Sequence, residues 1–234
     1  MASSRPLAVL SYQTPHRKTY DTCCRLKALG YKYVKIFALP LHYVKKRQPL
    51  ILHRPGFELP IETSVLAKNF GYYYCAINTV DEILEPEKTI FLVCGARILP
   101  QEFLKRYQVI NAHPGFIPYT RGLDSLKWAV YEKMPIGVTT HLLGEEIDAG
   151  EIIERRLVPI YPFDTFHIVA QRQYEMEVGM LVNAVEKIEG EHEFIFGGDN
   201  PIHRRMPLKL EQALLERFEE YKQEMFCENT GKEE

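Results

Sequence analysis

The stretch Thr89-Ile-Phe-Leu-Val-Cys-Gly95 is an unbroken, uncharged apolar run that is rich in β-branched and aromatic residues. It is too short for a membrane span, and its lack of polar alternation predicts a strand that is covered on both faces. Strands of this kind lie in the middle of parallel sheets, because helices then cover both sides. We therefore predict an α/β fold in which this stretch is a central strand.

Apolar runs and helical patterns alternate on both sides of this strand. The other predicted strands are Val9-Leu10, Tyr31 to Phe37, Val109 to Asn111 and Gly137 to Leu143. The predicted helices run from about Thr19 to Gly30, from Glu62 to Phe70, from Leu123 to Lys133, and from an N-cap at Asp164 to Gly190. Such alternation is typical of βαβ units. The predicted fold class is an open, twisted, mostly parallel Rossmann-like sheet with helices on both faces.

The remaining parts of the chain are predicted to extend this body. Residues 1–190 form the predicted α/β domain, and residues 191–234 form a short C-terminal extension with one amphipathic helix. The apolar stripe of that helix predicts docking onto the main domain, and it consists of Leu210, Leu214, Phe218, Tyr221 and Met225. The segment from Leu39 to Pro60 contains four prolines and a basic run, which predicts a surface excursion.

The composition is close to that of an average globular protein, with 234 residues, 46% of them apolar and 26% charged. The net charge of -2 argues against a protein that binds nucleic acid by neutralising phosphates. The longest uncharged apolar stretches stop well short of the roughly 20 residues that a membrane span needs, so we expect no membrane partner. Five cysteines without a C-x-x-C pair favour a reducing, cytoplasmic location.

The polar residues of interest follow two of the predicted strands. A glycine-rich phosphate loop is absent after the first strand, so a dinucleotide or ATP site there is not expected. Asn111-Ala-His113-Pro-Gly115 and Asp148 instead follow later strands, whose carboxyl ends border the usual ligand crevice of such sheets. The amide of Asn111 can donate to an oxyanion, His113 can move a proton, and Asp148 can hold the imidazole. Each motif alone is also typical of a structural turn, but this Asn-His-Asp trio predicts acyl-transfer chemistry.

Together these motifs resemble the formyltransferase family that uses 10-formyltetrahydrofolate. The resemblance covers about residues 88 to 155. Within this range, Leu92–Leu99 looks like the family's strand and loop around the pterin ring, and His141–Gly150 looks like its second folate loop. It implies that the trio is catalytic and that 10-formyltetrahydrofolate is the cosubstrate, with no metal. Apolar side chains and free main-chain groups suit a flat heterocycle with a polar edge. The folate-binding candidates are Arg97, Ile98, Leu99, Leu143, Gly144 and Glu146.

Three features bear on the acceptor amine. The turn after the first strand lacks the Gly and Ser/Asn-rich pattern with which the purine enzyme of the family binds its substrate phosphate. The residues after 190 are too few for the β-barrel domain with which the tRNA enzyme holds its acceptor. The loop after His113 contains Pro118-Tyr-Thr-Arg-Gly122, which is similar to sugar N-formyltransferases. The resemblance thus implies formylation of a nucleotide-linked amino sugar, as in the synthesis of surface polysaccharide or glycan precursors.

Tyr119 and Arg121 in this loop are the candidates for binding the acceptor. Arg121 offers a planar fork for a phosphate or a hydroxyl pair, and Tyr119 offers a ring face with a polar tip. The alternative is that both side chains pin the loop, since loop arginines often bond to carbonyl groups. The cations that could hold a diphosphate are Arg17, Lys18, Lys45, Lys46, Arg121, Arg204 and Arg205.

Several alternatives stay open. Glycinamide ribonucleotide as the acceptor, or hydrolysis of formyltetrahydrofolate by water, would use the same trio. A metal-dependent hydrolase could use His113, His141 and Asp148 as ligands, although no H-x-x-x-H or clustered Cys supports it. For His141, a histidine packed beneath the site is the alternative to a second proton carrier. A binding module without activity is the rival outside enzymes, and a homodimer is one assembly that we consider.

Overall fold

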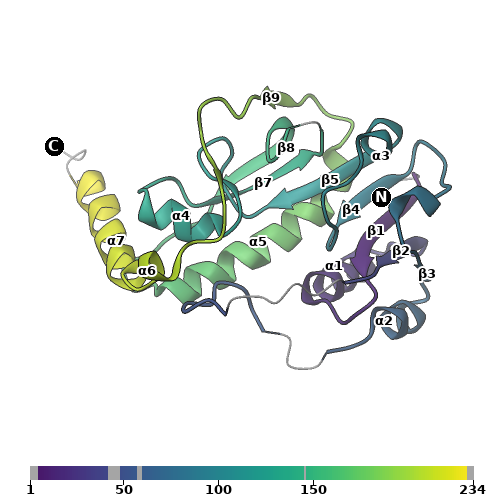
Figure 1. Ribbon diagram of the computed structural model, residues 1–234, viewed down its shortest axis with the longest axis horizontal. Coiled ribbons are helices and arrows are strands. Elements are labelled where there is room, and N and C mark those ends of the chain that lie inside the picture. Colours follow the sequence, from purple (N-terminus) through teal and green to yellow (C-terminus); the bar gives the residue numbers. More distant parts are fainter. Residues whose placement is uncertain (1–4, 42–47, 57–59, 145, 231–234) are drawn as a thin grey trace.

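The computed structural model describes residues 5–41, 48–56, 60–144 and 146–230, with side chains described up to residue 225. Within these residues, eight strands form one sheet in the order β3-β2-β1-β4-β5-β7-β8-β9 (Figure 1). Its strands are β1 (Leu7–Tyr12), β2 (Val34–Leu39), β3 (Tyr73–Ala76), β4 (Ile90–Val93), β5 (Gln108–His113), β7 (Gly137–Leu142), β8 (Gly150–Leu157) and β9 (Glu193–Ile195). Neighbours from β3 to β5 are parallel, and those from β5 to β9 are antiparallel. The mostly parallel α/β sheet is confirmed, with β4 as a central strand.

Helices cover both faces of the sheet, as predicted. The described helices are α1 (Arg17–Ala28), α2 (Thr63–Phe70), the 3-10 helix η1 (Val80–Glu82), α3 (Gln101–Arg106), α4 (Ser125–Tyr131), α5 (Phe166–Lys187), α6 (Leu208–Glu211) and α7 (Leu214–Thr230). On one face, α1, α2 and the second half of α5 pack on the strands through residues such as Leu26, Leu66 and Leu181. On the other face, η1 and α3 pack through Val80 and Phe103. These two layers hold the carboxyl ends of β1, β4 and β5 at one edge of the sheet.

The end of α1 explains why β2 begins later than predicted. Gly30 has a positive φ of 86°, and its N–H donates to the carbonyl of Lys27 at 3.0 Å. The N–H of Tyr31 donates to the carbonyl of Leu26, also at 3.0 Å. This is a Schellman motif, which satisfies carbonyl groups at the helix end. Tyr31 therefore caps the helix, and the strand starts only at Val34.

The long helix α5 confirms the predicted apolar stripe but corrects its N-cap. Thr165, not Asp164, is the N-cap, because its hydroxyl accepts from the N–H of Ile168 at 3.3 Å. Asp164 instead accepts from the N–H of Tyr161 and pairs with Arg172. The stripe is buried along its whole length, and it consists of Phe166, Ala170, Tyr174, Val178, Leu181, Val185 and Ile188.

Two differences concern elements around β7. The helix predicted from Leu123 to Lys133 is shorter, because Asp124 and Lys133 both have φ of 56° and lie outside α4. The sequence interpretation also missed β8 and β9. Charged residues interrupt the pattern of β8 on its exposed side, so its apolar signal is weak. These two strands make the second half of the sheet antiparallel.

The C-terminal extension packs on the main body. β10 (Ile202–His203) pairs with β6 (Arg121–Gly122), and β9 joins the main sheet. Leu214, Phe218 and Tyr221 of α7 are buried in a cluster with residues of α4 and α5, which confirms the predicted docking. The prediction of one amphipathic helix is corrected, because Leu210 lies on α6 and the rest of the stripe on α7, and Met225 is 37% exposed, so the stripe ends before it. The domain boundary near residue 190 stays a prediction.

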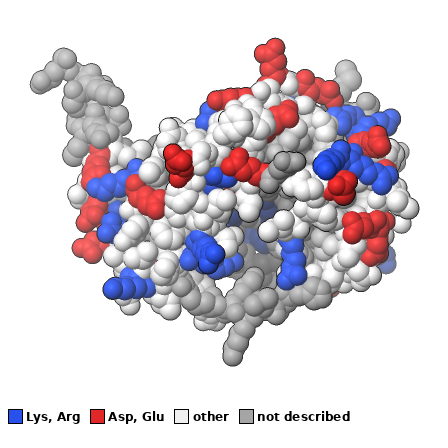
Figure 2. All heavy atoms as spheres, turned by 45° about the horizontal axis from the view of Figure 1, so that its top comes forward, with Lys and Arg blue, Asp and Glu red and all other residues white. Residues whose placement is uncertain are grey.

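The surface fits the mixed charge of the sequence. Acidic and basic side chains are interspersed on the face shown in Figure 2. In the described part of the Leu39–Pro60 excursion, residues 48–56 contain no helix or strand, whereas the basic run at 45–47 lies outside the described residues. None of the helices in the described ranges is long and apolar enough to cross a lipid bilayer.

Candidate active site

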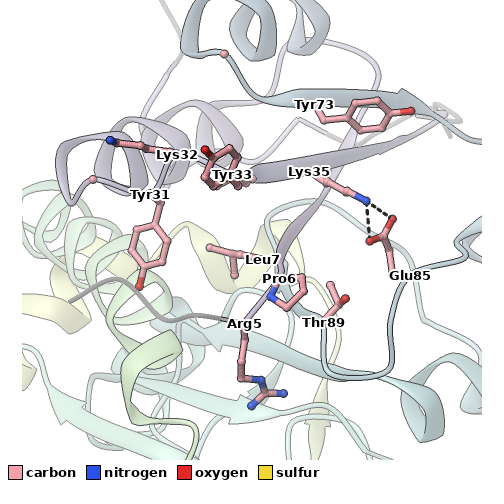
Figure 3. A pocket seen from close by; sticks show the side chains of 13 residues that line it. Arg5, Pro6, Leu7, Tyr31, Lys32, Tyr33, Lys35, Tyr73, Glu85 and Thr89 are labelled. Carbon is pink, nitrogen blue, oxygen red and sulfur yellow. Dashed lines mark hydrogen bonds and ion pairs between the residues drawn. The ribbon is translucent and has the colours of Figure 1, made fainter.

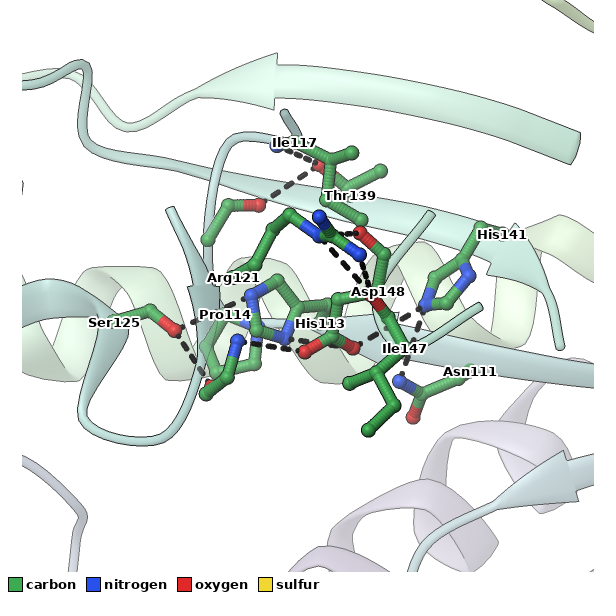
Figure 4. A network of polar contacts seen from close by, with 12 residues as sticks. Asn111, His113, Pro114, Ile117, Arg121, Ser125, Thr139, His141, Ile147 and Asp148 are labelled. Atoms are coloured by element: carbon green, nitrogen blue, oxygen red, sulfur yellow. Dashed lines mark hydrogen bonds and ion pairs between the residues drawn. The ribbon is translucent and has the colours of Figure 1, made fainter. Parts of the chain in front are cut away.

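A cavity of about 670 Å³ opens at the carboxyl ends of β4 and β5, and the Asn-His-Asp trio lies in its wall. Figure 4 shows the polar contacts among these three side chains and their neighbours. Asn111 and His113 are two residues apart on β5, so both side chains point to the same side of the sheet. Ala112 between them points to the opposite side, into the apolar core. Asp148 reaches the same cavity from the loop between β7 and β8. The two predicted loops thus share one crevice.

His113 is buried, with a relative exposure of 4%, and polar groups face both of its ring nitrogens. Its Nδ1 lies 3.4 Å from Oδ1 of Asp148. Its Nε2 lies 3.0 Å from the carbonyl oxygen of Thr120 and 3.2 Å from the hydroxyl of Ser125. These contacts fix the orientation of the ring. When the imidazole is charged, its Nδ1–H can donate a hydrogen bond to the carboxylate of Asp148.

Asp148 is held in an uncommon backbone conformation with φ of 46°. Aspartate and asparagine tolerate this left-handed region better than most residues. Its Oδ2 accepts a hydrogen bond from the backbone N–H of Gly122 at 2.8 Å, and its Oδ1 is directed toward His113. The carboxylate is therefore oriented by a main-chain donor from β6, the short strand that follows β5 in the chain.

His141 lies behind Asn111 on the neighbouring strand. The register pairs these two residues, and Nδ2 of Asn111 lies 3.3 Å from Nε2 of His141. Burial lowers the pKa of His141 to about 4, against the opposing effect of the Asp148 charge. The ring is therefore neutral near pH 7, and its Nε2 can accept one of the two amide N–H groups of Asn111. This fits the interpretation of His141 as a residue packed beneath the site.

Arg121 does not have the environment expected of an acceptor-binding residue. It is 2% exposed, and its guanidinium donates to the carbonyl oxygens of Ile147 at 2.5 Å and Asp148 at 3.0 Å. It also lies 3.2 Å from the carboxylate of Glu146. A Cβ added to Gly197 would fall 1.7 Å from Nη1 of Arg121, so a side chain there would displace the guanidinium. These contacts agree with the alternative in which Arg121 pins the loop of residues 146–148, and its acceptor-binding role stays a prediction.

Tyr119 is 43% exposed and stacks on Phe116, with 6.2 Å between the ring centroids. Although it is fully described, it is not among the residues of the cavity wall. Its acceptor-binding role stays a prediction.

The folate-binding candidates differ in their surroundings. Ile98 is 88% exposed and lies in the cavity wall together with Ile147. Leu99 is 8% exposed, and its side chain packs in the core beneath the sheet, so the expectation that it presents an apolar face to a ligand is wrong. Leu143 is half-buried against the same core. The other candidates are exposed, and they are Arg97, Gly144 and Glu146.

A second cavity, of about 630 Å³, lies at the opposite edge of the sheet, near the amino ends of β1 and β2 (Figure 3). Leu7, Tyr31 and Val34 line it, and Lys35 pairs with Glu85 at 2.7 Å. It contains none of the predicted site residues. The chemistry-bearing side chains are therefore gathered in the first cavity.

A family model described as "Formyl transferase" matches residues 56–185 of the chain. The matched range spans more than half of the chain and includes β4, β5 and the whole trio. The chain belongs to the formyl transferase family. The family membership predicted from the sequence motifs is thus confirmed.

Curated members of the family match a part of this chain. Formyltetrahydrofolate deformylase 2 of Arabidopsis thaliana is 36% identical over 112 residues, which is 45% of this chain and 34% of that protein. Phosphoribosylglycinamide formyltransferase of Haemophilus influenzae is 29% identical over 117 residues, 48% of this chain and 55% of that protein. The matched region therefore spans about half or less of these relatives.

Solved structures of other formyltransferases share the fold. WlaRD, described as a sugar 3N-formyl transferase in the presence of dTDP and 5-N-formyl-THF, superposes with a TM-score of 0.64 and 12% identity, over 92% of this chain and 80% of that one. An N-formyltransferase from Helicobacter canadensis, in complex with folinic acid and dTDP-3-aminofucose, gives 0.63 and 13% over the same shares. At such low identity these likenesses establish the fold.

The sequence interpretation missed a buried charge cluster in the cavity wall of this family member. Glu177 of α5 is 1% exposed and pairs with Lys18 of α1 at 2.7 Å and with Arg54. Burial raises the pKa of Glu177, but the two cations outweigh this effect and bring it down to about 2. Glu177 therefore stays ionised, and two cations against one carboxylate leave a net positive charge. A glutamate on the apolar side of a predicted helix was the signal that could have revealed it.

Among the residues that the structure describes, no group of three or more His, Cys, Asp or Glu side chains is placed to hold a metal ion.

Proposed function

We propose that this chain transfers the formyl group of 10-formyltetrahydrofolate to the primary amine of a nucleotide-linked amino sugar. The observation that carries the proposal is the pairing of His113 with Asp148 at 3.4 Å, beside Asn111 in the wall of one cavity. An amide donor, an imidazole and a carboxylate in this order serve an acyl transfer that passes through a tetrahedral intermediate.

The trio divides the work of the reaction. The neutral amine nitrogen of the acceptor attacks the formyl carbon, and the bond from that carbon to N10 of the folate then breaks. The amine loses one proton and N10 gains one, so atoms and charges balance. In the intermediate, Asn111 and the protonated ring of His113 stabilise the oxyanion, and Asp148 stabilises the imidazolium. Because His141 occupies one N–H of Asn111, the other N–H is available for the oxyanion.

The folate is proposed to lie against the exposed apolar side chains of Ile98 and Ile147, with its polar edge on main-chain groups near residues 97–99 and 143–147. Arg97, Leu99, Leu143, Gly144 and Glu146 would contribute through their backbone or through loop structure. Solved relatives of the same fold carry 5-N-formyl-THF or folinic acid, which supports a folate in this cavity.

On the acceptor side, the cations of the cavity wall support a ligand with phosphate groups. Lys18 and Arg54 are held together by Glu177, and Arg17 and Arg205 also line the cavity. Charge-assisted hydrogen bonds to phosphate are among the stronger polar interactions. The Pro-Tyr-x-Arg-Gly motif and the dTDP-linked amino sugar bound by one solved relative add support for a nucleotide sugar.

The second candidate is hydrolysis of formyltetrahydrofolate. The 36% identity to a deformylase favours it, because water can replace the amine without any change in the trio. Glycinamide ribonucleotide as the acceptor is a variant of the first candidate, favoured by the phosphoribosylglycinamide relative. A cytoplasmic location and a homodimer stay predictions.

One experiment separates these candidates. The purified protein is incubated with 10-formyltetrahydrofolate alone, with glycinamide ribonucleotide, and with dTDP- and UDP-linked amino sugars, and the formamide and formate products are quantified by mass spectrometry. We expect formamide from a nucleotide sugar, and much less from the same sugar without its nucleotide, because the cations then lack a partner. Formate release at the same rate with and without amines would instead identify a deformylase.

We expect Arg121→Ala to lower kcat/KM for both substrates, because the guanidinium holds the 146–148 loop that carries Asp148. Loss of a buried, charged donor that serves several acceptors costs about 2 to 4 kcal/mol, which corresponds to a fall in Tm of roughly 5 to 15 °C. Calorimetry and steady-state kinetics would show a lower Tm and a lower kcat/KM for folate and acceptor alike. Tyr119→Ala is the matched control in the same loop, and we expect it to leave Tm within about 2 °C. A loss confined to the acceptor KM in Arg121→Ala would restore the original substrate-binding assignment.

A further inference from the structure

The 48–56 segment supplies part of the cavity wall although it contains no helix or strand. His53, Arg54 and Pro55 from this segment line the cavity that contains the trio. A segment without secondary structure leaves its backbone groups to be satisfied by partners elsewhere in the fold. The position of Arg54 therefore depends on what holds the backbone of this segment.

A buried carboxylate of the C-terminal extension provides such an anchor. Glu211 on α6 is completely buried, and its Oε2 accepts from the backbone N–H of Leu50 at 2.7 Å. Its Oε1 pairs with the ammonium of Lys127 on α4, which is also completely buried. One carboxylate thus joins three parts of the chain that are far apart in sequence.

A second contact ties the same stretch of the extension to the same segment. Asp124 accepts from the backbone N–H of Met206 at 3.0 Å and lies 3.5 Å from Arg205. The same carboxylate lies 3.8 Å from Nε2 of His53. The extension therefore contacts the 48–56 segment directly at Leu50 and, through Asp124, at His53.

The chemistry of the Lys127–Glu211 pair indicates a role beyond stability. A fully buried ion pair contributes little net stability, because desolvation of both charges offsets their attraction. An apolar pair of similar volume would fill the same space at least as well. It would lack an acceptor for the N–H of Leu50, which is the feature that distinguishes the carboxylate.

We propose that Glu211 is a positioning residue that fixes the 48–56 segment and thereby presents Arg54 to the acceptor. The proposal rests on the proposed formyl transfer to an anionic acceptor. Arg54 reaches Glu177 beside the trio, and it lies 5.8 Å from the ring centroid of Tyr174, so its guanidinium occupies a defined place on the acceptor side. Arg17 holds the other end of the segment by donating to the carbonyl of Gly56 at 2.9 Å, so loss of the Leu50 contact would loosen the segment on the side that precedes Arg54 and make the place of this cation less defined.

The test compares two double variants that both remove the ion pair. Replacing Glu211 alone would leave an unpaired buried ammonium and could unfold the protein. Lys127→Met combined with Glu211→Gln keeps an oxygen that can accept from Leu50, whereas Lys127→Met combined with Glu211→Leu does not. The two proteins differ in the carboxamide of residue 211, whose oxygen can accept from Leu50; its buried NH2 group would tend to loosen the Gln variant, so a Gln variant that exchanges more slowly than the Leu variant shows the effect of the acceptor.

We expect the Leu variant to show at least tenfold faster amide hydrogen exchange in peptides that cover residues 48–56, with the Gln variant close to wild type. Kinetics are then measured with the nucleotide sugar that the wild-type protein formylates. The KM for this acceptor should rise about tenfold in the Leu variant, while the KM for 10-formyltetrahydrofolate and kcat stay within about twofold of wild type. A purely structural role would lower Tm without this split between the two KM values.

Unchanged exchange in the Leu variant would overturn the anchoring role, and faster exchange with an unchanged acceptor KM would overturn the positioning role. Absence of formyl transfer by the wild-type protein to any acceptor would refute the proposed function instead. Hydrogen exchange would in that case still decide whether Glu211 holds the segment.

Discussion

An Asn111→Ala variant is expected to turn over about 100-fold or more slowly than the wild-type protein, since loss of one oxyanion donor typically costs this much. Asn111 sits at the carboxyl end of β5 with its amide held by His141 at 3.3 Å. The donor is thus oriented before the reaction and needs no rearrangement when charge develops on the oxygen. Steady-state kcat and the Kd of 5-formyltetrahydrofolate, measured by calorimetry, provide the test.

The affinity for the folate should change little, because the oxyanion forms only along the reaction. An Asn111→Asp variant is the matched control, because the aspartate side chain has the size and shape of asparagine but lacks both amide N–H groups. It should be at least as slow as the alanine variant. A large loss of folate affinity with turnover preserved in the bound complex would show that Asn111 binds substrate and does not stabilise the oxyanion.

An Asp148→Asn variant is expected to lose activity by about 100-fold or more with its fold intact, which is the size of effect typical of lost general acid and base catalysis. The asparagine keeps an oxygen for the N–H of Gly122 and tolerates the φ of 46°, but it removes the negative charge beside Nδ1 of His113. Without that charge the imidazolium is no longer stabilised. Measurement of kcat and Tm over a range of pH checks both parts of this expectation.

For the wild-type protein, activity should rise with pH, because an ammonium group cannot attack the formyl carbon. Asp148→Ala is the control for the backbone, since alanine disfavours the left-handed region by about 1 to 2 kcal/mol and should lower Tm where asparagine does not. Rates near wild type in Asp148→Asn would rule out the proposed electrostatic role of the carboxylate.

The identity and order of the central elements were predictable because their signals are local. The run from Thr89 to Gly95 has the uncharged, β-branched pattern of a strand buried on both faces, and β4 lies in the middle of the sheet. The apolar stripe of α5 repeats at helical spacing over 22 residues, and a periodic pattern of that length is hard to mistake. The trio could also be placed, since strand ends and their loops meet at one edge of such a sheet.

The strands β8 and β9 were not predictable in the same way. β8 carries charged residues on its exposed side and lies near the antiparallel end of the sheet. A strand that is covered less completely needs fewer apolar residues, so its sequence resembles that of a loop. Its place in the sheet follows from pairing with β7, which is a contact between distant parts of the chain.

Local sequence patterns were therefore enough to predict the family, the fold class and the three residues that meet in one cavity, because strand periodicity and loop motifs depend on neighbours along the chain. Tertiary contacts alone decided the surroundings of the charged side chains. The sequence could not show which groups surround Arg121, and only the approach of residues 146–148 to it places carbonyl groups beside its guanidinium. Lys18, Arg54 and Glu177 lie far apart in sequence, and only folding brings the two cations beside the carboxylate, where its removal from water strengthens their attraction.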